Sequence, residues 1–331
     1  MRILILKTSA LGDVVHALPV LTELRRRLPD ARIGWVVEEA FAPLLEGRPD
    51  LDAVIPVRTR IWRRPAAWGQ AVGEIVRFVR ALQAFSPDVA LDLMGNHKGG
   101  FLAALTLADR RVGLARPFRR EPSSALWINQ PVTPAGVHAV ERNLATLQAL
   151  GIEAGTIDFG GERLFPEPPA PEETEGFILL HPGAGWGNKR YPPADWAAVA
   201  RLLGERLGLP TAVACAPGEE ALAEAVAAAS DGHARIESLP TLDRLAHRLR
   251  QARLVLAGDT GPLHLAHALG TPVLAVMGPT DPARHGPYGS PERAIFHRLP
   301  CSFCYKRFDE TKACLFEVRP EAIVERALTL L

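Results

Sequence analysis

The sequence contains little cysteine, no long apolar run and almost no net charge. Four cysteines in 331 residues are too few for a disulfide framework. No apolar run approaches the roughly 18 residues that a membrane-spanning helix needs, and Lys7 and Asp13 make the first apolar stretch too short for a signal peptide. A formal charge of +1 argues against nucleic-acid binding by the chain as a whole. We therefore expect a globular, cytoplasmic protein.

The positive charge is concentrated in the first half of the chain. Residues 1–160 hold 20 basic and 16 acidic residues, and the remainder holds 18 and 21. Two short segments carry the excess: "RTRIWRR", with Arg58, Arg60, Arg63 and Arg64, and the pair Arg119 and Arg120. They are equally compatible with a solvated surface and with a site for an anionic substrate.

Short apolar segments alternate with amphipathic ones along the whole chain. Strands are predicted at 2–6, 32–38, 53–57, 88–95, 176–182, 210–217, 252–259 and 271–278, and helices at 193–208, 219–230 and 262–270. A segment rich in proline and glutamate, 161–176, is predicted to be a linker. The pattern predicts an α/β protein with two doubly wound Rossmann-like domains, 1–160 and 177–331, facing an interdomain cleft.

Ligands of such sheets bind beyond the carboxyl ends of the strands, and the first loop there is "KTSALGD", Lys7–Asp13. Gly12 would allow a tight turn. Asp13 is placed at the start of a helix, where it is either an N-cap or a general base.

The second loop, "HPGAGWGNKRYP" at 181–192, follows a predicted strand. Gly183, Gly185 and Gly187 would free the backbone to surround an anion, and Lys189 adds a charge. The loop is neither a dinucleotide fingerprint nor a P-loop, so a plain connection is an equal alternative.

The third loop, "AGDTGPLHLAHALG" at 257–270, combines Thr260 as a helix cap, Pro262 in the first turn and His264. Such a helix start can bind an anion; the alternative is a capped helix with ordinary histidines. Two anion loops in one domain and a carboxylate in the other indicate a transfer reaction with a nucleotide-diphosphate leaving group.

Several motifs together resemble the ADP-heptose:lipopolysaccharide heptosyltransferases, glycosyltransferase family 9, and among them the type I branch. They are "KTSALGDVVHALPVL", "WVVEEAF", "VIPV" followed by "RIWRR", "REP" at 120–122, "HAVER" at 138–142, "GDTGPLHLAHALGTPV" and "MGPTDPARHGPYG". The resemblance covers most of the chain. It implies a GT-B fold and an inverting transfer of L-glycero-D-manno-heptose from ADP-heptose to a Kdo sugar of lipid A.

The resemblance also implies roles for individual residues. Asp13 would be the general base, and Lys189 would bind the diphosphate. The donor would further be held by Gly183, Ala184, Glu219, Asp259, Thr260, Gly261 and His264. The anionic acceptor would be held by Ser9, Gly12, Arg60, Arg63, Arg64, Lys98, Arg120 and His138. A lipid-anchored acceptor would bring the protein, expected to be a monomer, to the cytoplasmic leaflet of the inner membrane as a peripheral protein. The last helix could pack back on the N-terminal domain.

No cofactor is expected. Asp50 and Asp52 form a "DLD" sequence like the metal-binding pair of other glycosyltransferases, but they precede a predicted strand of the acceptor domain. Zinc at Cys301, Cys304 and Cys314, with His297 as a fourth ligand, is the less favoured alternative to packing of reduced thiols. Three other functions stay open: a family 9 transferase with another donor or a later core acceptor, a GT-B sugar-nucleotide epimerase, and a non-catalytic binder.

Overall fold

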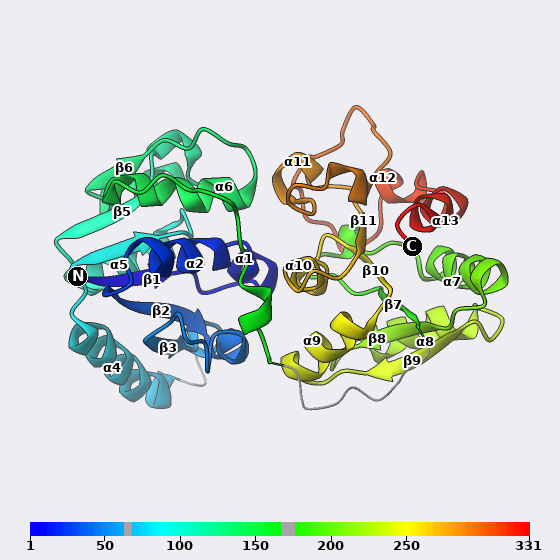
Figure 1. The fold of residues 1–331 in the computed structure, drawn as a ribbon, viewed down its shortest axis with the longest axis horizontal. Helices are drawn as coiled ribbons and strands as arrows, with labels where there is room; N and C mark the ends of the chain where they lie inside the picture. The colour runs from blue at the N-terminus through cyan, green and yellow to red at the C-terminus, as the bar shows by residue number, and fades with distance from the viewer. Residues whose placement is uncertain (63–67, 167–175) are drawn as a thin grey trace. The chain divides into compact units, whose positions relative to one another are not determined.

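The chain folds into two compact units, Met1–Leu164 and Phe165–Leu331, each built on a six-stranded sheet (Figure 1). The computed structural model describes residues 1–62, 68–166 and 176–331. Arg63 and Arg64 of the predicted acceptor site lie outside this part, as does most of the predicted linker. Within the described residues, no helix is both long and apolar enough to span a membrane.

The first unit has a parallel sheet with strand order β3-β2-β1-β4-β5-β6. Its strands are β1 (Arg2–Leu6), β2 (Arg32–Glu38), β3 (Ala53–Val57), β4 (Val89–Asp92), β5 (Arg110–Leu114) and β6 (Gln130–Val132). Its helices are α1 (Leu11–Val15), α2 (Leu18–Arg27), α3 (Thr59–Trp62), α4 (Trp68–Phe85), α5 (His97–Leu105) and α6 (Ala139–Leu144), with short 3-10 turns that include η1 (Glu39–Leu44), η4 (Pro122–Trp127) and η6 (Gly161–Arg163).

The second unit repeats this topology, with strand order β12-β11-β10-β7-β8-β9 and all pairs parallel. Its strands are β7 (Ile178–His181), β8 (Thr211–Cys215), β9 (Ala234–Ser238), β10 (Leu254–Gly258), β11 (Val273–Val276) and β12 (Ala294–Ile295). Its helices are α7 (Pro193–Leu207), α8 (Glu220–Ala228), α9 (Leu242–Gln251), α10 (Gly261–Ala268), α11 (Pro282–His285), α12 (Ala313–Phe316) and α13 (Pro320–Leu328), with the 3-10 turn η7 (Gly187–Lys189).

The central strands are those that the sequence predicted. β4, β7, β8, β10 and β11 are buried along their whole length, and strands covered on both faces read as continuous apolar runs. The edge strand β3 was predicted as well, but β5, β6, β9 and β12 were missed: β6 has three residues, β12 has two, and β5 and β9 are only partly buried. Such strands carry too few apolar residues to be recognised from the pattern.

Each sheet has one point where the strand order reverses, between β1 and β4 in the first unit and between β7 and β10 in the second. Leu6 pairs with Asp92 at the first point, and His181 pairs with Ala257 at the second. The loops after these four strands therefore leave the same edge of their own sheet, which is where ligands of such sheets bind.

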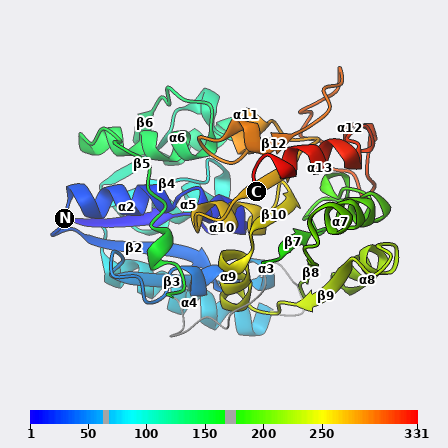
Figure 2. The same ribbon diagram turned by 45° about the vertical axis from the view of Figure 1, so that its right-hand side comes forward.

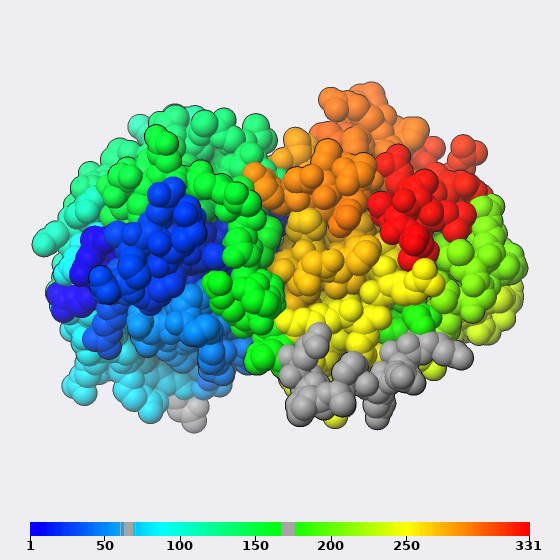
Figure 3. Space-filling view, viewed as in Figure 1, coloured from blue at the N-terminus to red at the C-terminus, as the bar shows by residue number. Residues whose placement is uncertain are grey.

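Residues 161–164 and the C-terminal helix each pack within one unit. Residues 161–164 of the predicted linker belong to the first unit, where η6 lies and Leu164 is fully buried. The buried face of α13, with Ile323 and Val324, belongs to the core of the second unit. The helix lies beside α7 (Figure 2), and its outer side forms part of the surface of this unit, red in Figure 3.

Candidate active site

Among the donor residues that the sequence predicted in the second unit, Lys189 and His264 contact Asp259. This residue follows β10, and its carboxylate is surrounded by side chains from three loops. Lys189 Nζ lies 2.6 Å from Asp259 Oδ2, and His264 Nε2 lies 3.0 Å from Oδ1. Thr280, which sequence reasoning missed, donates its hydroxyl to Oδ2 at 2.7 Å. The loops after β7, β10 and β11 therefore converge on one carboxylate.

This cluster keeps Asp259 ionised. Burial alone would raise the pKa of Asp259, but the hydrogen bond from His264 and the charge of Lys189 outweigh it and hold the pKa well below its ordinary value. The anionic carboxylate in turn holds the Lys189 ammonium at the end of η7. Lys189 is thus a positioned cation rather than a mobile surface lysine.

The N-terminus of α10 lies beside this cluster. Thr260 is the N-cap residue, as predicted, but its hydroxyl makes no capping hydrogen bond, so the predicted side-chain cap is wrong. Its Oγ1 is buried and has no hydrogen-bond partner among the described residues. The first-turn N–H groups of Gly261 and Leu263, between which Pro262 has none, and this hydroxyl are available for an anion.

Two glycines of the loop after β7 make room for other parts of the second unit. A Cβ on Gly183 would lie 2.0 Å from Glu219 Oε1, and a Cβ on Gly187 would lie 1.9 Å from the Asp309 carbonyl oxygen. Glu219, at the N-terminus of α8, is therefore placed against the loop that carries Gly183 and Ala184. Its Oε2 is buried with no partner within the described chain.

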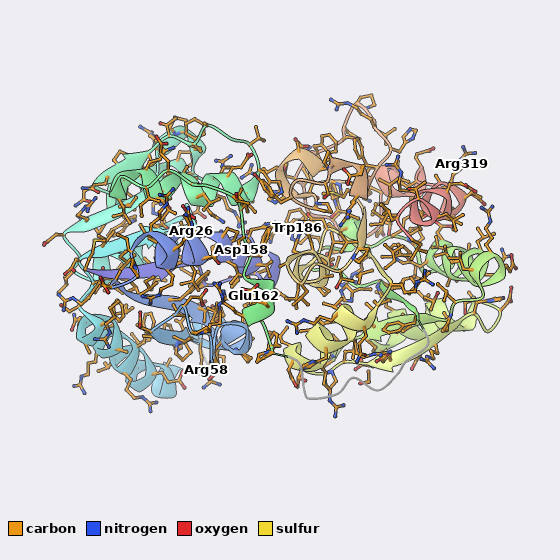
Figure 4. All side chains as sticks on the ribbon, in the orientation of Figure 1. Arg26, Arg58, Asp158, Glu162, Trp186 and Arg319 are labelled. Carbon is orange, nitrogen blue, oxygen red and sulfur yellow. The ribbon has the colours of Figure 1, made fainter. Side chains whose placement is uncertain are left out.

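Trp186 and Asn188 organise the lysine loop, and sequence reasoning missed both. Two cations, Lys189 Nζ and the Arg307 guanidinium, each lie 4.5 Å from the centroid of the Trp186 ring. Trp186 is labelled in Figure 4. Asn188 is buried and bonds to Lys306 and Phe308 through its side-chain amide. A segment more than a hundred residues away along the chain thus supports Lys189, which no local pattern could show.

His181, the last residue of β7, is a buried titratable group behind the same loop. Burial lowers the pKa of His181, although the charge of Glu219 acts in the opposite direction. The unfolded chain therefore binds a proton at a higher pH than the folded chain does. The contribution of His181 to stability is fully present above the unfolded pKa of about 6.5 and is lost as the pH falls below that value.

We expect His181→Gln to flatten the dependence of unfolding free energy on pH below pH 6.5. The wild-type slope that this residue supplies is at most about 1.4 kcal/mol per pH unit, with stability falling toward acid. Urea denaturation of both proteins at several pH values between 5 and 7.5 measures the two slopes. Equal slopes would show that His181 titrates alike in the folded and unfolded states.

In the first unit, Asp13 is not the N-cap that the sequence interpretation considered. Ala10 is the N-cap of α1, and Asp13 is in the first turn, where its Oδ2 accepts the Ala10 N–H at 3.1 Å. Its side chain is 49% exposed, and Oδ1 lies 3.8 Å from Lys7 Nζ. The predicted tight turn at Gly12 is wrong, since Gly12 is helical and buried. Ser9, which precedes α1, is partly exposed. The bond to the Ala10 N–H therefore uses only one of the two carboxylate oxygens of Asp13.

Lys98 lies in a polar cluster between the C-terminal end of β2 and the first turn of α5. Its Nζ is 3.8 Å from Glu38 Oε1 and 3.4 Å from Thr59 Oγ1. Glu38 is buried at the end of β2 and also accepts the Thr59 hydroxyl. Arg60 follows Thr59 in α3, and its side chain lies outside the described part of the chain. Glu38 is a further residue of the region that the sequence analysis did not include.

Arg119 and Arg120 have different environments, so they do not form the basic cluster that the sequence indicated. The Arg119 guanidinium is fully buried, 2.5 Å from Asp92 Oδ2 at the end of β4. The other oxygen of Asp92 accepts the N–H groups of Met94 and Gly95. Arg120 is exposed next to this pair. Asp92 and Arg119 therefore fix the backbone from which Arg120 projects.

His138 is buried at the N-terminus of α6. Its Nδ1 accepts the Val140 N–H at 3.2 Å, and its ring packs edge-on against His16 with 5.4 Å between centroids. One ring nitrogen is thus used as a helix cap, a role that the sequence reasoning did not consider.

The candidate metal ligands have other contacts. Asp50 is paired with Arg48 and Arg163, and Asp52 with Arg25. Cys301 and Cys304 are exposed thiols, and Cys314 is a buried one. Within residues 1–62, 68–166 and 176–331, no three histidine, cysteine, aspartate or glutamate side chains are arranged to hold a metal ion.

Two Rossmann-like units with these residues at the strand ends are typical of nucleotide-sugar glycosyltransferases. The family model of glycosyltransferase family 9 (heptosyltransferase) matches residues 75–314. Lipopolysaccharide heptosyltransferase 1 of Pseudomonas aeruginosa is 34% identical over 97% of this chain and 89% of its own length. The Escherichia coli protein of the same name is 35% identical over 87% of this chain and 91% of its own length.

Solved structures of heptosyltransferases are also similar to this chain. The structure of E. coli heptosyltransferase WaaC with ADP has a TM-score of 0.83 and 29% identity, with both chains covered completely. The structure of E. coli heptosyltransferase II has a TM-score of 0.74 and covers 100% of this chain and 98% of its own. At 20% identity this similarity supports only the fold. The chain belongs to glycosyltransferase family 9. It is a glycosyltransferase with the predicted GT-B fold.

Proposed function

We propose that the protein transfers L-glycero-D-manno-heptose from ADP-heptose to a Kdo sugar of lipid A, with inversion at the anomeric carbon. The observation that carries this proposal is the cluster of Lys189, Asp259 and His264 beside the N-terminus of α10. A cation and free backbone N–H groups at one place suit a leaving diphosphate. The choice of donor is supported by a similar solved structure, E. coli heptosyltransferase WaaC with ADP-2-deoxy-2-fluoro heptose.

In the proposed reaction, Asp13 accepts the proton of the acceptor hydroxyl. The hydroxyl oxygen forms a bond to the anomeric carbon as the bond from that carbon to the diphosphate oxygen breaks. ADP leaves with the bonding electron pair, and Lys189 with the α10 N–H groups stabilises the charge that develops on it. The chain's own cation thereby does the work that a bound metal ion does in other glycosyltransferases, and metal independence is part of the proposal.

The degree of similarity favours the first heptose transfer over a later one. Relatives named lipopolysaccharide heptosyltransferase 1 from P. aeruginosa and E. coli are 34% and 35% identical to the chain, whereas one named heptosyltransferase 3 is 23% identical. We therefore propose a Kdo sugar, rather than a heptose of the core, as the acceptor.

ADP release tests this proposal. Purified protein is given ADP-heptose in EDTA, with and without Kdo-lipid A, and the product's anomeric configuration is read by NMR. We expect ADP only when the acceptor is present, and an inverted product. Release without acceptor would point to hydrolysis. Release with a heptose-bearing core acceptor but not with Kdo-lipid A would replace the proposed acceptor by a later one.

A further inference from the structure

The outward face of α4 is unusual for a solvent-facing helix. α4 packs against β3, α3 and α5, and in Figure 1 it forms the lower edge of the first unit. Ala71, Phe78, Leu82 and Phe85 form its buried side. On the other side, Val72 is 63% exposed, Val76 is 42% exposed and Ile75 is 37% exposed. Single exposed aliphatic side chains are ordinary, but three within five residues form a continuous apolar stripe.

The same face is positively charged. Arg80 continues the row of Val72 and Val76 at four-residue spacing, and Arg77 lies in the adjacent row, so the face extends roughly 12 Å along the helix. Both arginines are exposed, and neither has an ion-pair partner within the described chain. The one acidic residue of α4, Glu74, is paired with Arg58 and accepts the indole N–H of Trp62.

We propose that this face, comprising Val72, Ile75, Val76, Arg77 and Arg80, docks the protein on an anionic lipid bilayer. Aliphatic side chains would enter the interface while arginines meet the lipid phosphates, as in amphipathic helices that lie in the membrane plane. The inference rests on the proposed function, because the acceptor proposed there is a lipid. The absence of a free acidic side chain on the face favours a polyanionic lipid surface over an ordinary protein partner.

Vesicle flotation tests this docking face directly. Wild-type protein is mixed with phosphatidylcholine vesicles that contain either no anionic lipid or about 30 mol% phosphatidylglycerol. We expect binding to the anionic vesicles that weakens with salt. We expect Val72→Ser/Val76→Ser and Arg77→Gln/Arg80→Gln each to weaken the partition coefficient about tenfold or more. Matched controls in the second unit are Phe316→Ser and Arg244→Gln, which remove an exposed apolar and an exposed basic side chain and should leave binding unchanged.

Activity assays separate this inference from the proposed function. With a water-soluble, deacylated Kdo acceptor, the α4 variants should turn over like wild type, and with Kdo-lipid A in vesicles they should be about tenfold slower or more. No turnover of the soluble acceptor by wild type would contradict the proposed function and leave the flotation result standing. Failure of wild type to float, or equal flotation of wild type and α4 variants, would overturn the docking face. A change of oligomeric state in the variants without a change in flotation would assign the face to a protein interface instead.

Discussion

Asp13→Asn lowers kcat at least about 10²-fold while ADP affinity stays at the wild-type value: this is the result we expect if Asp13 is the general base. The amide is nearly isosteric with the carboxylate and can still accept the Ala10 N–H that Asp13 accepts at the start of α1. It cannot take the proton of the acceptor hydroxyl. Steady-state kinetics of ADP release, with calorimetric titration of ADP, measures both quantities.

Asp13→Ala separates the catalytic role from the helix-capping one. Alanine loses the hydrogen bond to Ala10 as well as the base, and should cost about 0.5–1 kcal/mol of stability in addition to the loss of turnover. The ion pair with Lys7 adds little to this, because the carboxylate is half exposed and 3.8 Å away. If Asp13→Asn retained activity and Asp13→Ala did not, Asp13 would be a structural residue of α1 and not the base.

Lys189→Met should weaken ADP binding by about 30- to 1000-fold, which corresponds to about 2–4 kcal/mol. The substitution removes the cation and also leaves the buried Asp259 carboxylate without its closest partner. An uncompensated negative charge would then repel the diphosphate. Titration calorimetry with ADP gives the affinity, and thermal unfolding gives the cost to the fold.

The double variant Lys189→Met/Asp259→Asn distinguishes the two contributions. Removing both members of a buried ion pair is less costly than removing one, so the stability of the double variant should approach that of wild type. Its ADP affinity should stay low, because no cation is restored. Binding of ADP by Lys189→Met within about threefold of wild type would mean that Lys189 serves only to neutralise Asp259.

Two features of the sequence were sufficient to predict most of the fold and to single out the loops that carry Lys189 and Asp259, while the donor roles of these residues came from the family resemblance. Buried parallel strands such as β7 and β10 are continuous apolar runs, and each is followed by a loop with glycine and a charged residue. Once the order of strands is that of a doubly wound sheet, these loops must leave the same edge. Lys189 and Asp259 are 70 residues apart, and they are in contact for this reason.

Other features depend on neighbours that are remote in sequence. The sequence pattern placed Asp13 at the helix start, but the helix begins two residues earlier, since helix boundaries are the least certain part of pattern reading. The sequence left Arg119 open as a solvated or a substrate-binding arginine, and only the buried carboxylate of Asp92 shows that it supports the loop instead. Whether an arginine is free depends on which carboxylate the fold brings to it.

The sequence by itself determined the class of fold, the strand ends at which chemistry can occur, and the residue types found there. It could do so because hydrophobic periodicity and loop composition are local properties. Tertiary structure alone decided which charges are paired, that Thr280 bonds to Asp259, and that Trp186 and Asn188 support the lysine loop. It also decided that α4 presents aliphatic and arginine side chains on its outer face. These depend on burial and on contacts between distant segments, and so they exist only once the sheets have assembled.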